Sequence, residues 1–438
     1  MFIFRKYITN VSSLQLLQLA RFATVLMVSV VMAKTYMPVV EIGHYERLLF
    51  YGSALTFFWA TGLIQSLLPL FGNNLTFNSK TDPKNPAFFN AAFLLSLLGL
   101  AASLIVLAFS LFIKNNSSQP LIYWLMAYVA LSGPVLLIEY IYLLHDKPLL
   151  ILRYGAISLS LQFILIATPA LMHKPVSWCF GGLILSLLFR WVWLIILLLK
   201  VSRFKVSMPF IKEHFHLGYP LIISALLSGS AQYIDGLLVN WFYDPATFAI
   251  FRYGARELPL SVLLANAFDN SMTPEFNRHS LSENLLAIQR KSEKLMHIIF
   301  PVSIILLATS NWLYPLVFNE HFISSASVFN IYLLLAISRM VFPQTILVGH
   351  KLTRYVMAAS LAEMGIHISV CFLFIHLWGI NGVAFSTLFS YMAEKALLAL
   401  FVYQKLGIHP TKYMAIKTLL IYSSIAVLVY LFVNSLAV

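Results

Sequence analysis

Residues 216–276 read HLGYPLIISALLSGSAQYIDGLLVNWFYDPATFAIFRYGARELPLSVLLANAFDNSMTPEF. This stretch predicts two apolar helices, near residues 217–240 and 246–271, with a short turn at Tyr243-Asp244-Pro245 between them. Each helix is long enough to cross a bilayer, which takes ~20 apolar residues. The pattern indicates membrane-spanning helices and places the chain among the all-α polytopic membrane proteins.

The two helices also carry charged side chains, which are Asp235, Arg252, Arg256, Glu257 and Asp269. A charge at the bilayer centre costs roughly 2.5–3.5 kcal/mol on insertion scales, so we expect these groups to face protein or water. At ~100° per residue, six residues of the second helix, four of them polar or charged, fall on one face. They are Arg252, Arg256, Pro259, Leu263, Asn266 and Asn270. We expect this cationic face to line a cavity.

Several marked positions carry a family resemblance. They are the Tyr219-Pro220 entry, the pattern Gln232-Tyr233-Ile234-Asp235, the short turn, and the exit from Asn270 to Phe276 with its Pro274. This stretch resembles the start of the second half of the Wzx-like bacterial polysaccharide flippases of the MOP exporter superfamily. Residues 378–384 resemble the glycine-marked entry to that family's twelfth helix, and residues 322–332 with Pro343 resemble its tenth. The resemblance implies a MATE-like fold, with two bundles forming a V around a central cavity.

The composition agrees with a membrane protein and excludes several other classes. The chain is 60% apolar and 10% charged, against ~25% charged residues in soluble proteins. The first hydrophobic span is long and a dozen more follow it, so we expect no cleavable signal peptide. Cys179 and Cys371 lie in separate halves and are expected to be buried free thiols. The net charge of +13 fits basic cytoplasmic loops, and we expect no nucleic-acid partner.

Hydropathy predicts thirteen spans. The first six lie near 14–38, 47–71, 88–113, 121–144, 149–172 and 178–200. The other seven lie near 217–240, 246–271, 295–318, 325–349, 353–377, 380–404 and 412–436.

Basic residues predict the orientation. One alternate set of loops holds most of the 29 Lys and Arg residues, while the other set holds Lys34, Arg47, Lys114 and Lys174. Because cytoplasmic loops are enriched in Lys and Arg, we expect a cytoplasmic N-terminus and, with thirteen spans, an outer C-terminus. The expected location is the bacterial inner membrane.

The chain also repeats itself. Residues 65–71 match residues 270–276 at an offset of 205, and residues 182–189 match residues 382–389 at an offset of 200. We therefore expect a parallel repeat of two six-helix lobes, 1–205 and 206–405, followed by an additional helix in 406–438. The basic segment 200–213 is the expected inter-lobe linker.

The predicted substrate-binding residues are Arg21, Arg252, Arg256, Asn266 and Asn270. Two guanidinium groups about one turn apart suit a diphosphate, because each can bind phosphate oxygens in a bidentate manner. The alternative is that these arginines form internal ion pairs with Glu139, Asp235, Glu257 or Glu363. Arg190 and Arg339 are expected to be structural or to reach the span ends.

Asp235 and Pro259 have other expected roles. A carboxyl group in apolar surroundings holds a proton more readily, so Asp235 could bind a coupling H⁺ or Na⁺, or it could pair with an arginine. A proline inside a span removes one backbone hydrogen bond, so Pro259 is a candidate hinge or a static kink. Pro134, Pro169, Pro301 and Pro343 share this alternative.

The sequence contains no nucleophile motif, phosphate-binding glycine loop or metal-ligand spacing, so we predict a non-enzyme without a cofactor. The expected function is a flippase that moves a polyprenyl-diphosphate-linked oligosaccharide, a unit of O-antigen, lipopolysaccharide, capsule or exopolysaccharide, to the outer leaflet. Its expected partners are this glycan, the bilayer and other polysaccharide-assembly membrane proteins, and we expect a monomer.

Two rival functions stay open. One is a multidrug or cation antiporter of the same superfamily, which favours acidic cavities. The other is a membrane polymerase, ligase or glycosyltransferase, for which Glu41 and Glu46 would be the acidic pair. The short predicted outer loops argue against such an enzyme.

Overall fold

The computed structural model describes residues 10–35, 37–73, 86–112, 119–256, 261–262, 264–265, 268, 272 and 280–435. Helices make up nearly all of this part of the chain, which contains no strand. The prediction of an all-α fold is thus confirmed. The chain divides into two compact units, residues 1–233 with 244–246 and residues 234–243 with 247–438. The predicted lobe boundary at residue 205 stays a prediction.

The helices of the first unit follow the predicted spans, with one interruption. They are α1 (Asn10–Lys34), α2 (Val39–Asn73), α3 (Ala87–Phe112), α4 (Gln119–Ser132), α5 (Leu137–Leu144), α6 (Pro148–Leu171), α7 (Val176–Val201) and the first part of α8 (Met208–Phe242). The predicted span 121–144 is broken by the 3-10 turn η4 (Pro134–Leu136). Proline lacks the backbone N–H that a continuous helix needs at this point, so the break fits the sequence.

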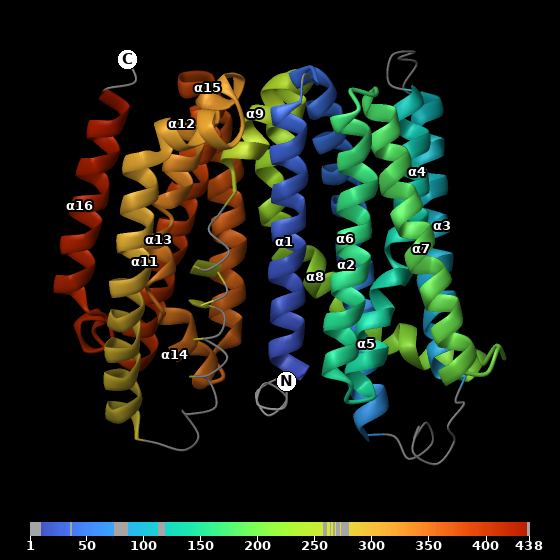
Figure 1. Cartoon of the computed structure of the whole chain (residues 1–438). Helices are drawn as coiled ribbons and strands as arrows, with labels where there is room; N and C mark the ends of the chain where they lie inside the picture. Colours follow the sequence, from blue (N-terminus) through green and yellow to red (C-terminus); the bar gives the residue numbers. More distant parts are fainter. Residues whose placement is uncertain are drawn as a thin grey trace. The chain divides into compact units, whose positions relative to one another are not determined.

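The second unit contains the end of α8 and seven further labelled helices. These are α9 (Pro245–Gly254), α11 (Leu281–Val317), α12 (Ile323–Leu333), α13 (Ala336–Arg339), α14 (Pro343–Gly349), α15 (Thr353–Leu406) and α16 (Ile416–Ser435). Pro245 and Ala246, at the start of α9, are assigned to the first unit. The predicted span 325–349 is divided into α12, α13 and α14, and α14 begins at Pro343. In Figure 1, α16 runs beside α11, and the two helices pack against each other.

Ten helices in the described part of the chain are long and apolar enough to cross a membrane. One of them, α15, has 54 residues and would be about 81 Å long as a straight helix, against ~30 Å of hydrocarbon. Its helical conformation is interrupted at Gly379, with φ 59° and ψ −137°. The two predicted spans 353–377 and 380–404 therefore meet at Gly379. Residues with a side chain rarely adopt the positive φ that this position has, whereas glycine adopts it readily.

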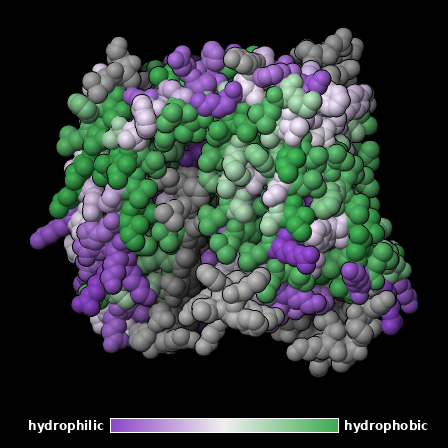
Figure 2. Space-filling view, viewed as in Figure 1, coloured by the Kyte–Doolittle hydropathy of each residue, from purple (hydrophilic) through white to green (hydrophobic). Residues whose placement is uncertain are grey.

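The side chains along the middle of the helices support a membrane location. On the face of the first unit that Figure 2 shows, hydrophobic side chains cover the middle of the helices and hydrophilic ones gather toward their ends. Leu104, Leu185 and Leu199 of this unit are exposed. A soluble protein rarely exposes large contiguous apolar areas, so the chain is a multi-pass membrane protein.

Polar side chains fix the segment that precedes α8. The Asn90 amide donates to the Lys205 carbonyl oxygen at 2.9 Å, and its side-chain oxygen accepts from the Ser207 N–H at 2.8 Å. Helix α8 begins at Met208, so the non-helical part of the predicted linker 200–213 is shorter than expected. Cys179 and Cys371 are buried free thiols, as predicted.

Two glycines allow neighbouring helical segments to approach closely. A Cβ atom at Gly382 would lie 1.9 Å from the Phe374 carbonyl oxygen, across the kink at Gly379. A Cβ atom at Gly182 in α7 would lie 2.1 Å from the Leu165 carbonyl oxygen of α6. These are backbone atoms, so a side chain at either position would force the helices apart.

We predict that Gly382→Ala lowers the free energy of unfolding by about 1–3 kcal/mol, the usual cost of overpacking. Thermal unfolding of the purified protein in detergent measures this change. Gly365→Ala is the matched control, because Gly365 lies in the same helix and a Cβ atom there would meet no heavy atom within 4 Å. Equal stability of the two variants would show that the contact at Gly382 is not tight.

Candidate functional site

The second unit contains a buried cluster of polar side chains around Asp235. Asp235 lies near the end of α8 and is only 7% exposed. Its Oδ2 accepts hydrogen bonds from the Tyr332 hydroxyl at 2.5 Å and from Thr387 Oγ1 at 2.6 Å. Its Oδ1 lies 2.8 Å from Nε2 of His367, which is 2% exposed. Three separate chain segments thus hold one carboxyl group.

Two further carboxyl groups lie close to this cluster. Glu363 lies one turn before His367, and its Oε1 is 4.0 Å from His367 Nδ1. Glu394 accepts a hydrogen bond from Ser360 Oγ at 3.0 Å, and its Oε2 lies 3.6 Å from Lys395 Nζ. Glu394 therefore has its own cation, whereas Asp235 and Glu363 share one imidazole.

The kink in α15 explains how these groups meet. His367 and Glu363 precede Gly379, and Thr387 and Glu394 follow it. The turn at Gly379 brings both halves of α15 to the same cluster, and Ser327 Oγ of α12 donates to Asn381 Oδ1 at 2.9 Å close to that turn. The cluster therefore connects α8, α12 and the two halves of α15.

The sequence left two alternatives for Asp235, a bound cation or an arginine partner. In the described residues its ion-pair partner is a histidine, His367. Sequence reasoning missed His367, Tyr332 and Thr387, because each is far from Asp235 in the chain and has no marked spacing to it. The one local signal was Glu363 four residues before His367, a spacing that places both on one helical face.

Arg252 and Arg256 are near each other in the chain but do not lie on one continuous helix. Helix α9 ends at Gly254, and the Arg256 N–H donates to the Gly254 carbonyl oxygen at 2.7 Å, which is not a helical pattern. The predicted helix 246–271 is wrong in this respect. Gly254 weakens the helix, and Ser325 Oγ donates to the Ile250 carbonyl oxygen at 2.7 Å near its end.

The Arg256 side chain is nevertheless held in a defined place. Its guanidinium carbon lies 4.8 Å from the centre of the Tyr253 ring. The Tyr253 carbonyl oxygen accepts a hydrogen bond from the Tyr314 hydroxyl at 2.9 Å. Both arginines are partly exposed, although Arg252 Nε and one terminal nitrogen of Arg256 are buried. Asn266, Asn270 and Pro259 lie outside the described residues, and their roles stay predictions.

Arg21 belongs to the first unit, where it forms an ion pair with Glu139 of α5. This pair is the one that the sequence offered as the alternative to substrate binding. The Arg21 side chain is still 32% exposed and also lines a cavity inside this unit.

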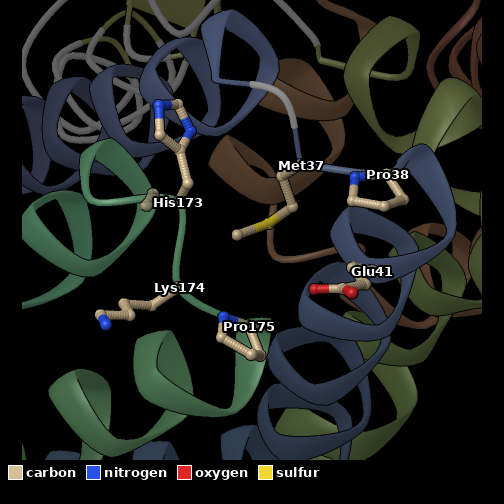
Figure 3. Close-up of a pocket in the computed structure, with 7 residues that line it drawn as sticks. Met37, Pro38, Glu41, His173, Lys174 and Pro175 are labelled. Carbon is tan, nitrogen blue, oxygen red and sulfur yellow. The ribbon is translucent and has the colours of Figure 1, made fainter.

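Glu41 and Glu46, which were expected in the first outer loop, lie in helix α2 and have structural partners. Glu41 Oε2 accepts a hydrogen bond from the Val176 N–H at 3.0 Å, at the start of α7. Glu41 lines a pocket of about 160 Å³, together with His173 and Lys174. Figure 3 shows the Glu41 carboxylate pointing into this pocket and the Lys174 side chain extending away from it. Glu46 is buried and accepts from Ser29 Oγ at 3.4 Å. The two carboxylates thus serve different contacts and do not form a paired acid site.

The residues that the structure describes do not form a metal centre. Among them, no group of three His, Cys, Asp or Glu side chains could hold a metal ion. The Asp235 cluster combines one imidazole with hydroxyl and carboxyl groups that contact each other.

The chain is similar to a known protein family and to several solved structures. A family model described as polysaccharide biosynthesis protein matches residues 78–327. No relative was found among the curated protein sequences.

Several solved membrane-protein structures share the fold. The chain superimposes on lipid II flippase MurJ in an inward closed conformation with a TM-score of 0.61, at 15% identity, covering 96% of this chain and 98% of that chain. For an inward-facing multidrug resistance MATE family transporter of the MOP superfamily, the TM-score is 0.63 at 13% identity, covering 91% and 98%. An outward-facing MATE family transporter of the same superfamily gives 0.54 at 13% identity, covering 91% and 93%. These likenesses show the fold, and they confirm the predicted MATE-like class.

Proposed function

The chain belongs to the polysaccharide biosynthesis protein family, and we therefore propose that it is a flippase for a polyprenyl-diphosphate-linked oligosaccharide. The cargo would be a repeat unit of O-antigen, lipopolysaccharide, capsule or exopolysaccharide, moved from the inner to the outer leaflet of the bacterial inner membrane. The observation that carries the proposal is the family match over more than half of a chain with a flippase and transporter fold. The N-terminus would be cytoplasmic and the C-terminus outside.

Arg252 and Arg256 are the proposed diphosphate-binding groups. Each guanidinium presents a planar fork of donors that matches the oxygens of a phosphate group. Tyr253 supports the Arg256 guanidinium, so little side-chain freedom would be lost on binding. Asn266 and Asn270 stay predicted substrate-binding residues, and the prenyl tail would stay in the bilayer.

The Asp235 cluster is the proposed coupling site, and the proposed coupling ion is H⁺. One imidazole can neutralise only one of the two carboxylates next to it, so the cluster becomes neutral when it binds a further proton. A buried net charge is costly, so the neutral, protonated cluster would be more stable in a buried position than the charged one. The contacts of Asp235 with α12 and both halves of α15 would then change when the proton leaves.

The membrane potential would be a second source of energy for moving the anionic cargo, besides the entry of protons. A potential negative inside favours outward movement of an anion by about 2.3 kcal/mol per charge per 100 mV. Arginines that moved with the diphosphate would reduce this gain. No cofactor is needed for either contribution.

A multidrug antiporter is the second candidate, because MATE family transporters share the fold. The observation against it is the sign of the charge near the end of α9, where both marked side chains are arginines. Cationic drugs would be repelled there, whereas a diphosphate would be attracted.

Deletion of the gene provides the test in cells. We predict that cells without the protein lose the surface polysaccharide and accumulate the lipid-linked glycan in the inner leaflet, where an added outer-leaflet glycosidase cannot reach it in intact cells. A plasmid copy of the gene should restore both. Normal polysaccharide without accumulated intermediate would contradict the flippase proposal, and increased drug sensitivity in its place would favour the antiporter.

A further inference from the structure

The first unit contains a cavity of about 340 Å³ that the proposed diphosphate site does not use. Its polar lining includes Arg21, Thr24, Thr56, Tyr128, Gln162 and Arg190. Small-molecule sites in proteins are typically ~300–1,000 Å³, so this cavity has room for a sugar ring but not for a whole oligosaccharide.

The charge inside this cavity is not balanced. Arg21 is paired with Glu139. Arg190 of α7 is only 8% exposed, and its NH2 group donates to Gln162 Oε1 at 2.5 Å. Its Nε has no hydrogen-bond acceptor, and no carboxylate lies within ion-pair distance of Arg190 in the described part of the chain. Two guanidinium groups therefore line the cavity, and one carboxylate, that of Glu139, pairs with Arg21.

A guanidinium without a carboxylate partner can bind an anion that is not part of the chain. Burying a charge without a partner is costly, and Arg21 and Arg190 also act on each other as like charges. One additional negative charge would balance Arg190, whose side chain lines the cavity.

The rest of the lining identifies the kind of anion. Thr24, Thr56 and Tyr128 offer hydroxyl groups and Gln162 offers an amide, which suit the hydroxyl groups of a sugar. A diphosphate has two or more negative charges and would leave the cavity negative, whereas a single sugar carboxylate would leave it neutral.

We propose that this cavity is a subsite for a carboxylate-bearing sugar of the transported glycan, with Arg190 as its anion-binding residue. The inference rests on the proposed function, since it takes the glycan as the cargo. It restricts that cargo to repeat units that contain an acidic sugar, such as a uronic acid.

Binding to the purified full-length protein tests the proposal. The protein is placed in nanodiscs of zwitterionic lipid, so that no anionic headgroup competes, and calorimetry measures the binding of three probes. Trigalacturonate can place one of its three sugar carboxylates in the cavity, maltotriose is a neutral trisaccharide, and pyrophosphate is the diphosphate probe. We expect trigalacturonate to bind, maltotriose to bind at least tenfold more weakly, and Arg190→Gln to weaken trigalacturonate binding by at least about tenfold.

Matched variants separate this subsite from the proposed diphosphate site. Arg153→Gln removes an exposed charge from α6, outside the cavity lining, and should leave trigalacturonate binding unchanged. Arg252→Ala with Arg256→Ala should remove pyrophosphate binding and leave trigalacturonate binding intact. If Arg190→Gln does not fold, Arg190→Lys keeps the charge, loses the planar fork and should still weaken binding.

Trigalacturonate binding that is absent, or that is equal in the wild type and the Arg190 variant, would overturn the proposal. Pyrophosphate binding that depends on Arg190 would also overturn it, because the cavity would then hold the diphosphate. A protein that binds trigalacturonate through Arg190 but ignores pyrophosphate would keep the acidic-sugar subsite and remove the diphosphate part of the proposed function.

Discussion

The double variant Arg252→Ala with Arg256→Ala is expected to abolish export of the surface polysaccharide while the protein still inserts into the membrane. Each arginine would form charge-assisted hydrogen bonds to the diphosphate, which are worth about 1.5–3 kcal/mol each. Loss of both would weaken substrate binding by roughly 10²–10⁴-fold. Complementation of a deletion strain, with the protein quantified in isolated membranes, gives the measurement.

A conservative substitution and a matched arginine sharpen this test. Arg256→Lys keeps the charge but loses the planar fork, so it should still impair export. Arg354 is the control, because its guanidinium carbon also lies 4.8 Å from the centre of a tyrosine ring, that of Tyr355, but on the exposed start of α15. Arg354→Ala should export normally. Wild-type export by the double alanine variant would show that Arg252 and Arg256 are structural.

Asp235→Asn is expected to remove the dependence of transport on a proton gradient without lowering the amount of folded protein. The asparagine side-chain oxygen can still accept hydrogen bonds from Tyr332 and Thr387, but the amide cannot bind and release a proton. Transport by the purified protein in vesicles, with an imposed pH gradient or an imposed Na⁺ gradient, provides the measurement. The wild type should respond to the pH gradient.

Two further substitutions show whether the cluster has this role. Asp235→Leu should lower the folded yield, because it leaves the buried Tyr332 and Thr387 hydroxyl groups without the acceptor that asparagine keeps, and each unsatisfied buried group costs about 1–3 kcal/mol. Asp146→Asn is the control for loss of an exposed aspartate, whose side chain accepts a hydrogen bond from Asn10. Full activity of Asp235→Asn with unchanged response to the pH gradient would exclude the coupling role. A response to the Na⁺ gradient alone would replace the proton by Na⁺.

The sequence predicted the fold well because hydrophobic length requires no knowledge of distant contacts. The spans of α1, α3, α6 and α7 follow from runs of apolar residues that match the bilayer thickness. The division of α15 was also predictable, since Trp378-Gly379 interrupts a long apolar run and Gly379 takes a positive φ.

Local interruptions and contacts between distant residues were harder to predict. Helical periodicity placed Arg252 and Arg256 on one face, but that reasoning holds only while the helix continues, and α9 ends at Gly254. Asp235 meets His367, 132 positions later in the chain, and no spacing rule connects them. Arg190 was expected to be structural, and only the three-dimensional arrangement places it beside Gln162 in a cavity.

Reconstituted flipping tests the central claim most directly. The purified protein is placed in vesicles with a polyprenyl-diphosphate-linked glycan in both leaflets, and an added glycosidase that cannot cross the membrane cleaves the outer pool. The flippase account predicts that the wild-type protein exposes nearly all of the glycan to the enzyme, while the variant with Arg252→Ala and Arg256→Ala leaves the inner pool protected, as in protein-free vesicles. An inner pool that stays protected with folded wild-type protein, under both a membrane potential and a pH gradient, would contradict the account.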